Sequence, residues 1–255
     1  MTRTAARVWQ RCSGGLLAFV AAAALLSGCG GAGKAAAPLA RSSSSSSPAP
    51  STTVHYTASV VAQAKVSSVA VFDQPTATTP SKTLPSPQPS GSPLVFLVQG
   101  SEGPRLHVLL PVRPNGSTGW IERSDVDLSQ HDYRIVVALA AHTITIFKGD
   151  AVFDQEPIGV GTKDTPTPGG TYYTKELYKL PSATGPYGPY AYALSGYSDV
   201  LTDFAGGDGV LGIHGTNDPS AIGHDVSHGC IRMSNAGITK LAQTLPLGVP
   251  VEIQA

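Results

Sequence analysis

Short apolar runs that end at glycine or proline constrain the fold of this chain more than any other feature. The 255 residues include 28 Gly and 21 Pro. Runs of a few apolar or β-branched residues, bounded by such turn formers, are typical of strands. In the middle of the chain we expect strands at 66–72, 94–99, 106–112 and 119–121.

The second half of the chain continues this pattern and adds one helical segment. The apolar spacing from Ile238 to Leu245 predicts a helix over 235–245, with Ser234 as its N-cap. One helix among many strands argues against alternating strands and helices, and it predicts a mainly β chain. Further strands are expected at 133–140, 143–147, 151–160, 172–180, 209–213 and 249–253.

The N-terminal residues have the pattern of a targeting segment. Three arginines precede an apolar run at 15–26, which is too short to span a bilayer comfortably. The run ends in L-S-G-C at 26–29, which resembles the processing box of bacterial lipoproteins. The resemblance implies that residues 1–28 are a signal peptide and that Cys29 carries lipid. The protein would then be anchored to the cell membrane, outside the cytoplasm and facing the cell wall. An ordinary signal peptide with an incidental cysteine is the alternative.

Residues 29–53 are built mainly from Gly, Ala, Ser and Pro, with an unbroken run of serines at 42–47. Such a composition cannot bury a core and predicts a disordered tether. We expect the tether to let the folded part stand away from the membrane surface. A low-complexity insert without a function is the alternative.

Residues 54–130 are predicted to form a small β domain that resembles a barrel. The segment 119–126 resembles the last strand and closing turn of bacterial Src-homology-type barrels. That resemblance implies a module that binds wall polymer, and a packing spacer is an equal alternative. Trp120 is expected in the core of this domain rather than on a ligand-binding surface.

Charge and cysteine usage narrow the function. The chain has 17 basic and 17 acidic residues, so it lacks the basic balance that is typical of nucleic-acid binding. Of the three cysteines, Cys12 would leave with the signal peptide and Cys29 would carry lipid. Cys230 then has no partner in a compartment where paired cysteines oxidise, which favours a catalytic role for it.

One stretch near the C-terminus carries the candidate chemistry. It holds Cys230 together with His214, His224 and His228. A free thiol has a pKa of about 8.5, so we expect a neighbouring imidazole to lower that pKa and make thiolate abundant at neutral pH. The amides of Gly229 and Cys230 are candidates for an oxyanion hole, because two successive N–H groups can point at a developing negative charge.

Two segments of this stretch resemble the signature of YkuD-type L,D-transpeptidases. They are H-G-T-N at 214–217 and S-H-G-C-I-R at 227–232. A third segment, at 165–171, resembles the T-P-x-G-x-[FY] sequence of the same family, with one additional glycine. The resemblance implies a β-sandwich-like catalytic domain over residues 131–255.

The resemblance also implies roles for single residues. Cys230 is the nucleophile and His214 its base, with the second ring nitrogen of His214 held by the carbonyl of Gly215. His228 is the competing base, because it is closer to the cysteine in sequence, and otherwise it orients the site. Ser227 either hydrogen-bonds the loop or an imidazole, or serves only as a turn former.

Four further residues are expected to contact or shape the substrate site. The guanidinium of Arg232 matches a carboxylate of a stem peptide, and Asn217 shapes the adjoining loop. Residues 181–208 are predicted to be a long loop whose tyrosines, including Tyr190 and Tyr192, form an aromatic lid beside the cysteine. Tyrosines that cover an open edge of the sheet are the alternative.

The family implies a two-step acyl transfer on peptidoglycan stem peptides. The thiolate attacks the carbonyl after the third residue of a tetrapeptide and expels the terminal D-Ala. The resulting thioester then passes to an amine of a neighbouring stem, which gives a 3→3 cross-link. The reaction requires neither a metal nor a cofactor, and a carbapenem is expected to acylate Cys230.

Three other interpretations stay open. A Cys–His peptidase, acting as an L,D-carboxypeptidase, would pass the acyl group to water. A zinc site of His214, His224, His228 and Cys230 has suitable ligand types, but His-x-Cys is not a usual zinc spacing. A catalytically silent wall-binding lipoprotein would act only through residues 54–130.

Overall fold

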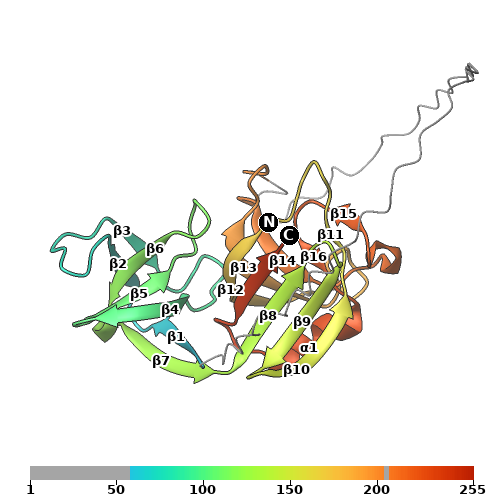
Figure 1. Ribbon diagram of the computed structural model, residues 1–255. Coiled ribbons are helices and arrows are strands. Elements are labelled where there is room, and N and C mark those ends of the chain that lie inside the picture. The colour runs from blue at the N-terminus through green and yellow to red at the C-terminus, as the bar shows by residue number, and fades with distance from the viewer. Residues whose placement is uncertain (1–57, 204–206) are drawn as a thin grey trace, which may run out of the picture. The chain divides into compact units, whose positions relative to one another are not determined.

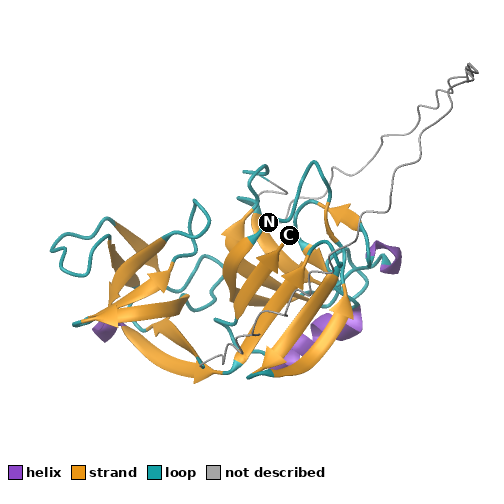
Figure 2. Cartoon of the chain, viewed as in Figure 1, coloured by secondary structure: helices purple, strands orange, loops and turns teal. Residues whose placement is uncertain are grey.

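The computed structural model describes residues 58–203 and 207–255 of the chain. The predicted signal peptide, the predicted tether and Cys29 lie outside these residues. The described residues belong to one compact unit, and none of their helices is long and apolar enough to cross a membrane. The architecture is mainly β, which confirms the prediction from the apolar runs (Figure 1, Figure 2).

The first sheet has seven strands, all paired antiparallel, in the order β3-β2-β6-β5-β4-β1-β7. It occupies the blue to green part of the chain in Figure 1. The 3-10 turn η1 (Arg123–Asp125) joins β6 to β7. The strands are β1 (Ser59–Ala64), β2 (Ser68–Phe72), β3 (Lys82–Pro85), β4 (Val95–Glu102), β5 (Arg105–Leu109), β6 (Thr118–Glu122) and β7 (Val126–His131).

Strand β4 is apolar on both faces, because each face packs on a different core. Successive side chains of a strand point to opposite faces. Phe96 packs into the internal core of the first sheet, together with Ile121. Its neighbours Val95 and Leu97 belong to a separate cluster that includes Tyr173 of the second sheet. The two sheets therefore share a buried apolar contact.

The second sheet has eight strands, in the order β10-β9-β8-β17-β12-β13-β14-β16. Most neighbours are antiparallel, but β8 pairs with β17, and β14 with β16, in parallel. Two short strands, β11 (Val160–Gly161) and β15 (Asp225–Ser227), form a separate parallel pair. The strands are β8 (Tyr133–Ala138), β9 (Thr143–Lys148), β10 (Ala151–Pro157), β12 (Gly170–Lys179), β13 (Tyr190–Tyr197), β14 (Val210–His214), β16 (Ile231–Arg232) and β17 (Pro250–Gln254).

The helix α1 (Asn235–Thr244) packs on the core of the second sheet. It begins after Ser234, whose Oγ accepts the amide of Gly237 at 2.9 Å, as expected of an N-cap. Ile238 and Leu241 are fully buried in the core. A second 3-10 turn, η2 (Pro219–Ala221), follows β14. The helix begins three residues after β16, so its packing holds the polypeptide that leads out of the site.

The predicted loop over 181–208 is wrong in its middle. Residues 190–197 form strand β13, a central strand of the second sheet. Its sequence is Y-A-Y-A-L-S-G-Y, in which small and aromatic residues alternate, and most of its side chains are buried. The glycines and prolines on either side favoured the prediction of a continuous loop, so this strand was missed. Strands β1, β3 and β7 were also not predicted.

The expected core position of Trp120 is wrong, because Trp120 is only partly buried and stacks on His107.

Candidate active site

Two neighbouring strand ends bring His214 and Cys230 into one pocket. His214 is the last residue of β14, and Cys230 directly precedes β16. The two strands are parallel with Ile213 opposite Ile231, which places Cys230 beside Gly212. The amide of Gly212 donates a hydrogen bond to the cysteine sulfur. Sheet register, rather than nearness in sequence, therefore brings the thiol and this histidine to the same pocket.

Hydrogen bonds within the turn 227–230 fix the cysteine. Ser227 Oγ donates to the carbonyl oxygen of Cys230 at 2.6 Å and accepts the amide of Gly229 at 3.1 Å. Ser227 thus hydrogen-bonds its own loop rather than an imidazole. Because the Gly229 amide is already engaged with Ser227, the structure argues against its predicted place in an oxyanion hole. The amide of Cys230 remains the candidate donor.

The loop that follows β11 supports this turn from outside. Thr167 Oγ1 donates to the carbonyl oxygen of Gly229 at 2.9 Å and accepts the amide of Gly161 at 2.9 Å. Thr165 Oγ1 donates to the carbonyl oxygen of Ser227 at 3.0 Å. These are residues of the T-P-T-P-G-G segment, so this segment contributes to the site as a brace for the cysteine turn.

His214 is buried, with 4% of its surface exposed. Its Nδ1 lies 2.6 Å from the carbonyl oxygen of Gly215. A carbonyl can only accept, so Nδ1 carries the proton and Nε2 has a free lone pair. Burial lowers the pKa of His214 to about 4; the Gly215 carbonyl opposes this, and the charge of Arg232 adds to it. The imidazole is therefore neutral at pH 7.

The thiol of Cys230 is also neutral. Burial raises the pKa of Cys230, and the Gly212 amide and the charge of Arg232 oppose that rise only in part. The sequence-based expectation of a thiol pKa lowered by an imidazole is therefore wrong for this resting state. A neutral imidazole carries no charge with which to stabilise a thiolate. The Cys230 side chain is partly exposed.

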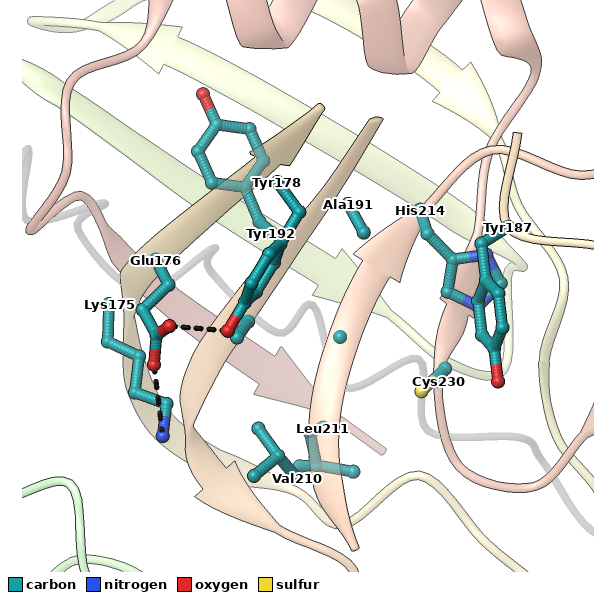
Figure 3. Close-up of a pocket in the computed structure, with 12 residues that line it drawn as sticks. Lys175, Glu176, Tyr178, Tyr187, Ala191, Tyr192, Val210, Leu211, His214 and Cys230 are labelled. Atoms are coloured by element: carbon teal, nitrogen blue, oxygen red, sulfur yellow. Dashed lines mark hydrogen bonds and ion pairs between the residues drawn. The ribbon is translucent and has the colours of Figure 1, made fainter. Parts of the chain in front are cut away.

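A pocket of about 230 Å³ contains both side chains (Figure 3). The ring of Tyr187 packs edge-on against His214, with 4.8 Å between the ring centroids, next to Cys230. Lys175 and Glu176 lie on the opposite side of the pocket in Figure 3. The remaining lining residues are Tyr178, Ala191, Tyr192, Ala193, Val210, Leu211 and Gly212. The pocket thus has a reactive side and a charged side.

Several predicted site residues lie elsewhere. His228 and Asn217 are exposed, and neither lines this pocket. Tyr192 is fully buried, and its hydroxyl donates to the carbonyl oxygens of Leu241 and Leu245, away from the cysteine (Figure 3). Tyr192 still lines the pocket through the rest of its side chain, so its predicted contact with the substrate stays a prediction. Tyr190 is partly buried against the core of the second sheet, so it is not part of a lid.

Arg232 acts on the site through its charge. It lies on β16, opposite His214 in the strand register. Its positive charge disfavours protonation of His214 and favours ionisation of Cys230. Its Nε is buried without a hydrogen-bond partner. This position leaves a carboxylate-binding role for Arg232 as a prediction.

Two charged pocket residues, Lys175 and Glu176, were missed by the sequence reasoning, whereas Tyr187 is one of the tyrosines of the segment expected beside the cysteine. The aromatic-rich loop around Tyr187 was a usable signal, but it did not say which tyrosine meets the histidine. Lys175 and Glu176 lie inside a predicted strand, where adjacent charged residues are more typical of a solvated face.

Among residues 58–203 and 207–255, no group of three or more His, Cys, Asp or Glu side chains is placed to hold a metal ion. His224 is exposed in the polar segment before β15. The zinc interpretation therefore has no ligand set in the described part of the chain.

Residues 132–253 match the family model of the YkuD L,D-transpeptidase catalytic domain. This part of the chain is thus similar to the L,D-transpeptidase catalytic domains of the YkuD type. YkuD of Bacillus licheniformis and YkuD of Bacillus subtilis are each 38% identical to it over 121 residues, which is 48% of this chain and 65% of each relative. The chain thus covers slightly less than two thirds of these relatives.

The solved structure of an L,D-transpeptidase from Mycobacterium smegmatis is 18% identical and covers 63% of this chain and 82% of its own, with a TM-score of 0.40. That likeness is too distant to add to the assignment.

Proposed function

We propose that this protein is a peptidoglycan L,D-transpeptidase that forms 3→3 cross-links through a thioester on Cys230. The observation that carries the proposal is the pairing of Cys230 with His214 in one pocket, where the Gly215 carbonyl leaves Nε2 of His214 free to accept a proton. The family of the catalytic domain supports the stem-peptide substrate.

In the first step, the sulfur of Cys230 attacks the carbonyl carbon of the third residue of a tetrapeptide stem. The thiol proton passes to Nε2 of His214 as the sulfur–carbon bond forms. The bond to the nitrogen of the terminal D-Ala then breaks, and the proton passes from His214 to that nitrogen. The product is a thioester and free D-Ala.

In the second step, the amine of a neighbouring stem attacks the thioester carbonyl. His214 takes the amine proton and returns it to the departing sulfur, which restores the thiol. Water in place of the amine would give a tripeptide, the carboxypeptidase outcome. General-base assistance of this kind contributes roughly 10²–10⁴-fold to the rate.

Because both partners start uncharged, proton transfer accompanies the attack rather than preceding it. The low pKa of His214 keeps Nε2 unprotonated over the whole neutral range. The amide of Cys230 is the proposed donor to the developing oxyanion, since the Gly229 amide is held by Ser227. His228 is proposed to orient the exposed edge of the site rather than to act as the base.

The test is the mass of the intact protein after incubation with a disaccharide-tetrapeptide donor. We expect a covalent adduct equal to the donor less D-Ala, absent in Cys230→Ala, and a cross-linked dimer among the products. His214→Ala should lose acylation far more than His224→Ala, which changes an exposed residue. Wall binding without any adduct would instead support the silent lipoprotein, and tripeptide without dimer would support the peptidase.

We also propose that the protein is lipid-anchored at Cys29 on the outer side of the cell membrane. The support is the L-S-G-C sequence at 26–29 after the apolar run. Metabolic labelling with a fatty acid should mark the wild-type protein and not Cys29→Ser, which should move from the membrane fraction to the soluble fraction. Equal labelling of both would contradict the proposal.

A further inference from the structure

Lys175 and Glu176 line the same pocket although they are adjacent in strand β12. Adjacent side chains of a regular strand point to opposite faces of the sheet. The pairing of β12 with β13 shifts register between Thr174 and Glu176, and such a bulge re-aims side chains. The bulge therefore places two charged groups on the pocket side of the strand.

Both charged groups are buried. Glu176 is 5% exposed and Lys175 is 8% exposed. Burial lowers the pKa of Lys175, and the nearby charge of Glu176 opposes that change. Two buried charges are costly unless each finds hydrogen-bonding partners, and Glu176 has two such partners.

Glu176 accepts its two hydrogen bonds through one oxygen and forms an ion pair with Lys175 through the other. Its Oε2 accepts hydrogen bonds from Ser90 Oγ, at 2.5 Å, and from the hydroxyl of Tyr178 (Figure 3). Its Oε1 lies 3.8 Å from Nζ of Lys175, beyond hydrogen-bonding distance. The carboxylate is thus fixed in direction by Oε2, and Oε1 can still accept a strong hydrogen bond.

Ser90 belongs to the first sheet, in the connection from β3 to β4, and lies 86 residues before Glu176 in the chain. The first sheet therefore supplies one of the two donors that orient a pocket side chain. Figure 3 shows Glu176 across the pocket from Cys230 and His214, with Ala191 and Leu211 between them. A donor whose acyl group is bonded to the sulfur of Cys230 would extend over this apolar surface towards Glu176.

We propose that Glu176 is a specificity-determining residue that accepts a hydrogen bond from an N–H group of the acyl donor through Oε1. We propose further that Ser90 is a positioning residue supplied by the first sheet. The inference rests on the proposed acyl transfer at Cys230. The N–H group belongs either to a side-chain amine of the donor or to its backbone, and the two sources share the same chemistry.

The experiment uses the full chain with Ser90→Ala, Ser90→Thr and Glu176→Gln, and with Ser92→Ala as the matched control from the same turn. Donor KM and kcat are measured with two tetrapeptides, whose third residue is lysine or norleucine. A hydrogen bond to a charged group is a strong one, so we expect Glu176→Gln to raise KM about tenfold and Ser90→Ala about fivefold, with kcat within about twofold. Ser90→Thr keeps the hydroxyl and should restore KM.

The two donors identify the N–H group. If wild type prefers the lysine donor and Glu176→Gln does not, Glu176 binds the side-chain amine. If Glu176→Gln weakens both donors equally, it binds a backbone amide. The inference is overturned if Ser90→Ala and Glu176→Gln behave like Ser92→Ala with both donors.

Alkylation of Cys230 by iodoacetamide, which uses no donor contact, should proceed at the same rate in all the variants. Unequal alkylation would show damage to the thiol itself and would overturn the positioning role. A wild-type protein that alkylates but forms no acyl adduct would instead refute the proposed function, so the two failures are distinguishable.

Discussion

The thiol of Cys230 and the imidazole of His214 are both uncharged at neutral pH, and this governs how they can act together. Burial raises the pKa of the first and lowers that of the second. Burial disfavours the charged form of each group, so a preformed thiolate–imidazolium pair is not the resting state. In the proposed reaction, the charge separation would arise only with substrate bound, when the developing oxyanion meets its donor.

The same burial makes the protein sensitive to acid. The pKa of His214 falls from 6.5 to about 4 on folding, so between these values the unfolded chain binds more protons than the folded chain. The stabilising contribution of the neutral imidazole is complete above pH 6.5 and is lost as the pH falls towards 4, on the order of 3 kcal/mol. Calorimetry between pH 7 and pH 4 should show a steeper fall in Tm for wild type than for His214→Asn. Equal slopes would contradict the assignment of a buried neutral histidine.

A substitution at Gly229 tests whether the turn 227–230 can accept a side chain without moving Cys230. Gly229 has φ of 110°, and a Cβ there would lie 3.3 Å from the carbonyl oxygen of Pro166. We expect Gly229→Ala to cost about 1–2 kcal/mol from its backbone conformation and to slow acylation at least tenfold through displacement of Cys230.

The control for this prediction is Gly223→Ala. Gly223 also has a positive φ, 87°, but nothing lies within 4 Å of its Cβ position. Denaturant unfolding should show a similar loss of stability in both variants, and only Gly229→Ala should lose acylation. If the two variants acylate alike, the turn tolerates the extra carbon and the geometric argument fails.

The loop from β11 to β12 is the element that braces the cysteine, and Thr167 is its central contact. Thr167→Val removes a buried hydroxyl that bonds the amide of Gly161 and the carbonyl of Gly229. One buried and one partly buried backbone group would be left unpaired, so we expect a loss of about 2–4 kcal/mol in the free energy of unfolding. Thr239→Val, whose hydroxyl bonds the carbonyl of Asn235 within α1, should change it by about 0.5 kcal/mol or less. Similar losses in both variants would show that the loop is not a brace.

Elements with a clear period were predictable from the sequence, and those whose burial depends on distant partners were not. The helix over 235–244 and strand β14 follow from local apolar spacing, and both lie where the pattern placed them. Strand β13 was missed because its alanines and glycine have weak strand preference on their own. It is a strand because β12 and β14 pair with it on both sides.

The candidate site divides in the same way. The two sequence segments at 214–217 and 227–232 pointed to His214 and Cys230 as candidates, and the structure places both in one pocket. The charged side of the pocket depends on a bulge in β12 and on Ser90 of the other sheet. Neither feature leaves a local pattern in the sequence, so Glu176 and Lys175 could only be found from the structure.

At the scale of the whole molecule, the two sheets are joined by a shared apolar cluster and by hydrogen bonds. Tyr173 of the second sheet is fully buried against Val95 and Leu97 of the first, and its hydroxyl donates to the carbonyl oxygen of Val95 at 3.0 Å. Arg113 of the first sheet donates to three carbonyl oxygens of the segment between β13 and β14, those of Ser198, Leu201 and Asp208.

These contacts predict a single unfolding transition. Wild type should melt in one step, with equal calorimetric and van't Hoff enthalpies. Arg113→Ala removes the three bonds to the β13–β14 segment, which are partly open to solvent, so we expect a loss of about 1–3 kcal/mol. Arg123→Ala is the control, because the guanidinium of Arg123 donates to the nearby carbonyl oxygen of Val126, at 3.4 Å, within its own sheet. Two separate transitions in wild type would contradict the shared core. An Arg113→Ala variant as stable as Arg123→Ala would show that the apolar cluster around Tyr173 joins the sheets without the help of the arginine.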